Sequence, residues 1–116
     1  DPVTLEDKRL MSMPPCSHLM SNYDGTLLVG DGCGSPADVA DAGSHDIVTD
    51  PFLHVFDLKA GTVRAVAHHD SSWRVHKGSR QVTHPHPSFT PDEKQILFSS
   101  DAEGEPALYL ADVGAP

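Results

Sequence analysis

The sequence predicts an all-β protein, and three observations point to that class. The chain holds 9 Gly and 10 Pro among 116 residues, only 6% of its residues are aromatic, and short apolar or alternating stretches recur between turn-rich ones. This pattern is typical of many short strands joined by tight turns, and it excludes a bundle of long helices. A length of 116 residues suits one domain or a piece of a larger one.

The expected strands fall into two groups. Alternation and β-branched or aromatic content predict one antiparallel group, with a hairpin turn that ends at Gly61 between its last two strands. A second, shorter group follows, and the chain stops one strand short of completing it. The expected strands of the first group are 18–21, 26–30, 52–58 and 62–68, and those of the second are 86–89, 95–100 and 107–112.

An internal repeat relates the two groups. Residues 18–29 align with 86–97 at a constant offset of 68, whereas 51–58 align with 106–113 at an offset of 55. The first copy therefore carries 13 additional residues, and this insertion lies within 33–50. Its small, acidic and turn-forming residues predict a loop.

Repeated four-stranded antiparallel sheets are typical of a β-propeller, which has about 4–8 such blades. We therefore expect a β-propeller fragment of about two four-stranded antiparallel blades, the last blade lacking one strand; a small sandwich is the alternative. Because the chain begins with Asp and two blades cannot close a ring, we expect an excised, C-terminal part of a larger propeller. The expected segments are an interblade connection (1–17), a first blade (18–70), an interblade loop (71–85) and an incomplete last blade (86–116).

The charge and the cysteines limit the partners and the compartment. Eight Lys and Arg against 17 Asp and Glu give a net charge of -9, which argues against a nucleic-acid partner. No apolar run reaches the roughly 20 residues of a membrane span, and no signal peptide is evident. Cys16 and Cys33 form no disulfide framework, so we expect a cytoplasmic protein. The exposed blade faces of such a fragment favour self-association.

The eight histidines include a candidate metal site. The repeat places His18 and His86 at equivalent positions in neighbouring blades, beside the expected channel. His84 lies two residues before His86, so on a strand both side chains would point to one face. With an amide oxygen from Gln81, the set His18, Gln81, His84 and His86 offers three nitrogens and one oxygen and leaves positions open. The alternative is that these histidines only form hydrogen bonds along the strands.

The loop 70–80 is a candidate substrate-binding segment. Arg74, Lys77 and Arg80 can bind carboxylates, and Trp73 can cover a sugar ring. In the alternative, the loop is a solvated connection in which Trp73 holds the blades together. His68 and His69, at a strand end, are further candidates for contact with a ligand.

The segment 79–92, with its Gln81-Val-Thr-His84-Pro-His86 element, resembles the C-terminal part of oligogalacturonate lyase, as do 16–25 and 50–57. The resemblance implies a seven-bladed propeller in which His18, Gln81, His84 and His86 hold a divalent metal ion of the manganese type, Mn²⁺. It also implies cleavage of short, often unsaturated oligogalacturonides by metal-assisted β-elimination, inside bacteria that degrade pectin.

The chemistry of β-elimination explains such a ligand set. A proton next to a carboxylate is weakly acidic, so a cation on that carboxylate stabilises the charge that develops when the proton leaves. The family's base is a histidine of an earlier blade with no counterpart here, so we expect this chain alone to be inactive and to bind metal weakly. Substrate binding would rest on the metal and on Arg74, Lys77 or Arg80, because the net charge repels a polyuronate.

Two other functions stay open at this point. One is a non-catalytic propeller fragment that acts as a protein-interaction module. The other is a metal-dependent hydrolase on a propeller scaffold, since the fold alone does not decide the chemistry.

Overall fold

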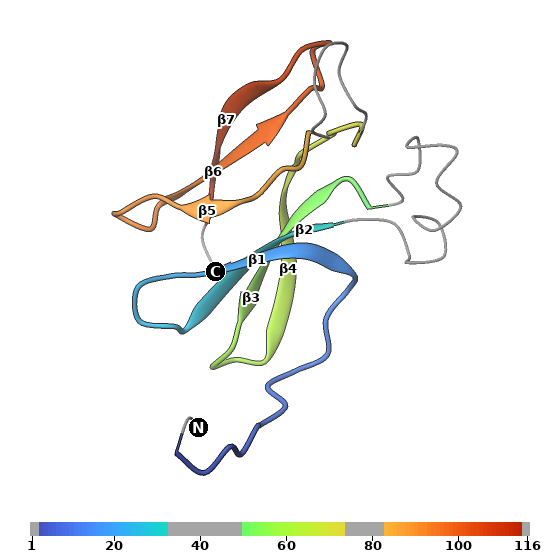
Figure 1. Ribbon diagram of the computed structural model, residues 1–116. Helices are drawn as coiled ribbons and strands as arrows, with labels where there is room; N and C mark the ends of the chain where they lie inside the picture. Colours follow the sequence, from blue (N-terminus) through green and yellow to red (C-terminus); the bar gives the residue numbers. More distant parts are fainter. Residues whose placement is uncertain (1–2, 33–49, 74–82, 115–116) are drawn as a thin grey trace, which may run out of the picture.

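Two antiparallel sheets make up the part of the chain that the structure describes, which is residues 3–32, 50–73 and 83–114 of a computed structural model (Figure 1). The first sheet has the order β1-β2-β3-β4 and the second β5-β6-β7. The strands are β1 (Cys16–Ser21), β2 (Leu27–Gly32), β3 (Phe52–Asp57), β4 (Thr62–His68), β5 (Ser88–Phe89), β6 (Gln95–Ser100) and β7 (Ala107–Asp112). The predicted all-β class and the four-plus-three arrangement of strands are confirmed, and the division into blades and connections stays a prediction.

The strand register confirms the internal repeat. Leu27 pairs with Asp57 in the first sheet, and Gln95 pairs with Asp112 in the second. These two pairs are related by the same offsets of 68 and 55 that align the sequences. The two sheets are therefore copies of one unit, and the additional residues of the first copy lie between β2 and β3.

The turns of the two copies share a backbone conformation but differ in sequence. Gly25 lies in the left-handed region, with φ +72°, where a residue without Cβ meets no steric penalty. Glu93 is its equivalent in the second copy and has φ +59°. The Glu93 carboxylate accepts hydrogen bonds from the Tyr23 backbone N–H at 2.8 Å and from Asn22 Nδ2 at 3.2 Å. A strained residue thus ties the second sheet to the first.

The core lies between the sheets. Val29 of β2 pairs with Val55 of β3, and Leu53 lies two residues before Val55, so the three side chains gather on one face. They form one buried cluster with Ile96 and Phe98 of β6. Across this contact β1 lies next to β5, and β4 next to β7 (Figure 1). The described residues include no helix long and apolar enough to cross a membrane.

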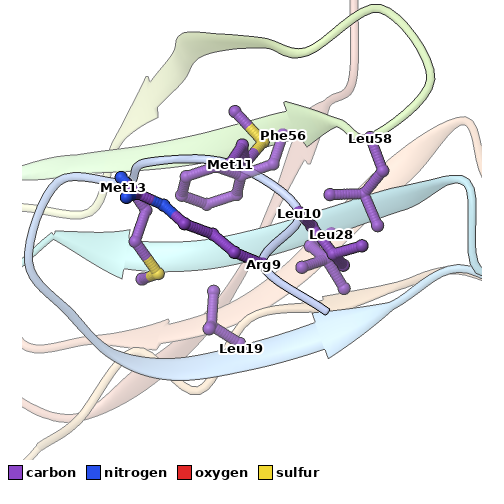
Figure 2. A pocket seen from close by; sticks show the side chains of 8 residues that line it. All are labelled: Arg9, Leu10, Met11, Met13, Leu19, Leu28, Phe56 and Leu58. Atoms are coloured by element: carbon purple, nitrogen blue, oxygen red, sulfur yellow. The ribbon is translucent and has the colours of Figure 1, made fainter. Parts of the chain in front are cut away.

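The outer faces of both sheets carry apolar side chains. On the second sheet Leu108 and Leu110 are 71% and 57% exposed. On the first, an extended N-terminal segment passes over the sheet and leaves a cavity of about 280 Å³ (Figure 2). The cavity is lined by Arg9, Leu10, Met11, Met13, Leu19, Leu28, Phe56 and Leu58.

The expected start of the second group of strands is wrong by two residues. The strand expected at 86–89 begins only at Ser88, because His86 has φ +43° and interrupts the extended backbone. Pro85 and Pro87 flank it and have no backbone N–H to donate to a neighbouring strand. In contrast, β2 continues to Gly32, two residues beyond the expected end.

Ile96 tests the contact between the sheets, because its side chain is fully buried. We expect Ile96→Ala to lower the free energy of unfolding by about 2–5 kcal/mol, since it leaves a cavity in the core. The control is Leu108→Ala in the same 116-residue chain, where Leu108 is exposed, with an expected change within about 0.5 kcal/mol. Urea denaturation measures both, and equal losses in the two variants would contradict this account of the core.

Candidate metal centre

Three imidazoles meet where the two sheets approach each other. His18 comes from β1, and His84 and His86 come from the segment before β5. One ligand atom of each histidine lies within 4.8 Å of the other two. The ring centroids of His18 and His86 are 3.7 Å apart, and those of His18 and His84 are 5.0 Å apart. Three nitrogen donors at this spacing can hold one metal ion.

A buried carboxylate fixes the first of these histidines. The register of β1 shifts between Cys16 and Leu19, so the strand bulges at His18. Asp31 of β2, which is fully buried, accepts the His18 backbone N–H at 2.8 Å and lies 2.6 Å from the ring Nδ1. Since a carboxylate accepts, Nδ1 donates and Nε2 keeps its lone pair for a ligand. One side chain therefore sets both the backbone and the tautomer of His18.

The other two histidines converge by a different route from the one predicted. His84 and His86 do not lie on a strand, so the expected same-face geometry of a strand is wrong. The left-handed backbone of His86 turns the chain instead, at a cost on the order of 1–3 kcal/mol. The Pro85 carbonyl between them accepts the Ser99 backbone N–H at 2.8 Å and so anchors this turn to β6.

Burial affects the chemistry of His84. Desolvation lowers the pKa of His84 below its ordinary value, and the neighbouring His18 and His86 lower it further. The neutral imidazole is the form that binds a metal. His84 therefore stays available as a ligand to a lower pH than an ordinary histidine.

Trp73 packs against the cluster of three histidines. Its ring centroid is 4.5 Å from that of His84 and 6.2 Å from that of His18, nearly parallel to the latter. Its backbone is left-handed, with φ +59°. The structure thus places Trp73 beside the candidate ligands, at the junction of the sheets.

Four of the predicted site residues belong to the segment 74–82, which the structure does not describe. Gln81, the fourth candidate ligand, and the candidate substrate-binding residues Arg74, Lys77 and Arg80 lie outside the described residues. Their roles stay predictions.

His69 was a candidate for contact with a ligand because it lies at a strand end. In the structure it binds the backbone instead. It is only 1% exposed, and its Nε2 donates to the carbonyls of Gly32 at 3.0 Å and Asp50 at 3.2 Å. Its Nδ1 accepts the Ser71 backbone N–H. Both ring nitrogens are therefore occupied by the backbone.

Asp31 was not predicted as a site residue. A signal was present, because Asp31 lies two residues after the core residue Val29 and so points to the buried face of β2. An Asp at a core position is rare unless it is paired, and the repeat already placed His18 on the neighbouring strand.

Comparison with known proteins shows the family of this chain. A family model described as oligogalacturonate lyase matches residues 1–115. This chain belongs to the oligogalacturonate lyase family. It is 67% identical over 113 residues to the oligogalacturonide lyase of Pectobacterium atrosepticum and 66% identical to the oligogalacturonate lyase of Dickeya dadantii. It covers 29% of each of these relatives, so it spans less than a third of their length.

Solved structures of oligogalacturonate lyases share the fold. An oligogalacturonate lyase in complex with manganese superposes with a TM-score of 0.81 at 61% identity, over 98% of this chain and 27% of that one. The enzyme from Vibrio parahaemolyticus superposes with a TM-score of 0.82 at 52% identity, over 98% of this chain and 28% of that one. The two sheets therefore have the arrangement found in this family.

Asp31 provides a test of the site. We expect Asp31→Asn to weaken the binding of Mn²⁺, used as the probe ion, by about 10–100-fold, because His18 loses the carboxylate that orients it. Isothermal titration calorimetry measures the affinity. The control is Asp112→Asn, which alters a carboxylate bonded to Gln95 on the distant edge of the second sheet. An affinity that is unchanged in Asp31→Asn would refute the orienting role.

Proposed function

We propose that this chain forms the metal-binding part of a lyase that cleaves short, unsaturated oligogalacturonides by metal-assisted β-elimination in pectin catabolism. The observation that carries the proposal is the meeting of His18, His84 and His86, with ligand atoms within 4.8 Å of one another. Membership of the oligogalacturonate lyase family and the names of the relatives support the substrate and the reaction. Because the chain spans 29% of those relatives, the activity belongs to the proposed whole protein.

The donor set fits a divalent first-row metal ion. Imidazole nitrogens suit such ions, and the carboxylate of Asp31 behind His18 is the support that metal-binding histidines commonly have. His18, His84 and His86 would hold the ion, with Gln81 as a proposed fourth ligand. Manganese is the proposed metal, and a solved relative is described in complex with it. A bound divalent ion would supply positive charge beside the uronate carboxylate, where negative charge develops as the neighbouring proton leaves.

The residues of this chain prepare the site before substrate arrives. Asp31 holds His18 in one tautomer, and partial burial lowers the pKa of His84 and so favours its neutral form. Fixed donors need no reorganisation during the reaction, which is the main advantage of a preorganised site. Arg74, Lys77 and Arg80 are the proposed partners for the substrate carboxylates. The base that removes the proton is proposed to lie outside this chain.

We also propose that these sheets are blades near the C-terminal end of a seven-bladed propeller in the cytoplasm. The neighbouring positions of β1 and β5, the first strands of the two copies, support this arrangement. So do the apolar outer faces, on which Leu108 and Leu110 are largely exposed and could pack on further blades. Self-association of the chain through these faces is a further prediction.

The decisive test uses the full-length lyase with His86→Ala. We expect the wild-type protein to bind one Mn²⁺ and to release an unsaturated, ultraviolet-absorbing product, and the variant to lose both properties. Lys59→Ala is the control, because Lys59 is exposed in the hairpin turn between β3 and β4, away from the three histidines, and its loss should change neither property. A product without ultraviolet absorption would indicate a hydrolase, and a wild-type protein that binds no metal would leave only an interaction module.

A second prediction concerns the chain by itself. We expect the 116-residue chain to bind Mn²⁺ more weakly than the full-length lyase and to have no lyase activity, because the base and the remaining blades are missing. Calorimetry and the ultraviolet assay, run side by side on both proteins, measure this. Activity of the chain alone would contradict the placement of the base.

A further inference from the structure

Asp101 forms hydrogen bonds to a turn that follows the first sheet. Its carboxylate follows β6 directly and is 8% exposed. It accepts the Ser72 backbone N–H at 2.7 Å and the Ser72 hydroxyl at 2.5 Å. Asp101 belongs to the second sheet, whereas Ser72 follows the last strand of the first. The carboxylate therefore fastens the end of one sheet to the other.

The fastened turn has a strained backbone. Asp70 has φ +47° and Trp73 has φ +59°, so two residues with side chains lie in the left-handed region within four positions. Such strain persists only where the surrounding structure fixes the backbone, and it gathers at functional sites. Here the fixing contacts are the two bonds of Ser72 to Asp101 and, at the start of the turn, the bond from the Ser71 N–H to His69 Nδ1.

The turn contacts the candidate ligand His84 on two sides. The indole of Trp73 packs on the imidazole, with the ring centroids 4.5 Å apart. The Ser71 hydroxyl donates to the carbonyl of Thr83, the residue before His84, at 2.5 Å. The position of the turn therefore sets both the ring and the backbone of this ligand.

The same turn is also tied to the strand that supports His18. His69, at its start, donates from Nε2 to the carbonyl of Gly32, which directly follows Asp31. The carboxylate that orients His18 and the turn that packs on His84 thus share one hydrogen-bonded network. A change at Asp101 would shift the two ligands relative to each other.

We propose that Asp101 is a positioning residue for the metal centre. By holding the turn 70–73, its carboxylate fixes His84 at the distance from His18 that metal binding requires. Asp101 acts through Ser72, Ser71 and Trp73 and is not itself a ligand. The inference rests on the proposed function, because it assigns a role at the same metal site.

The test compares Asp101→Asn with Asp57→Asn in the full-length lyase. Asp57 is a matched control, since its carboxylate also accepts backbone N–H groups in a turn, those of Lys59 and Ala60, at the far end of the first sheet. We expect Asp101→Asn to weaken Mn²⁺ binding by about 10–100-fold in calorimetry, as is usual for groups that orient metal ligands. Asp57→Asn should leave the affinity unchanged even where thermal unfolding shows a loss of stability.

A metal-free measurement separates this inference from the proposed function. Trp73 is the only tryptophan of the 116-residue chain, so its fluorescence reports on the turn without any metal. We expect the emission of the chain to shift to longer wavelength in Asp101→Asn, as the indole leaves His84 and meets water, and to stay unchanged in Asp57→Asn. Unchanged emission in Asp101→Asn, or equal loss of Mn²⁺ affinity in both variants, overturns the inference. A wild-type lyase that binds no Mn²⁺ overturns the proposed function instead.

Discussion

The apolar contact between the two sheets is the constraint on which the rest of the structure depends. Val29 and Val55 of the first sheet pack with Ile96 of the second, and together these side chains are almost completely removed from water. His18 belongs to the first sheet, while His84 and His86 precede the second. The distances between the imidazoles are therefore set by how the sheets pack, because no single strand carries all three donors. A change in the packing of the core would therefore also change the distances between the candidate ligands.

Patterns along the chain were sufficient to predict the strands, the repeat and three candidate ligands. Side-chain alternation is a property of the strand itself, and a repeat offset requires no knowledge of the packing. The equivalence of His18 and His86 therefore predicted that their imidazoles lie together, as the structure shows, although the strand geometry assumed for His86 was wrong. The contact of Asp31 with His18 and that of Trp73 with His84 were not predicted, because they depend on hydrogen bonds and ring contacts between segments distant in sequence.

Buried polar groups are concentrated at one end of this contact. Asp31, His69 and Asp101 are each at most 8% exposed, and each is satisfied by hydrogen bonds to the backbone. Burying such groups costs free energy unless every donor and acceptor is paired, so the network has few alternative arrangements. The left-handed residues Asp70 and His86 lie in the same region. Several of the left-handed residues and buried polar groups therefore lie where the candidate ligands must be held in fixed positions.

The two copies of the repeat support their equivalent histidines with different groups at the same position. Asp31 of β2 and Ser99 of β6 are separated by the repeat offset of 68. Asp31 binds His18 through its carboxylate, whereas Ser99 donates its backbone N–H to Pro85, the residue before His86. The repeated backbone thus brings two imidazoles to one place, and the residues that differ determine how each is held. His18 receives a fixed tautomer from a carboxylate, while His86 receives its direction from a left-handed backbone, so the two ligands should respond to different substitutions.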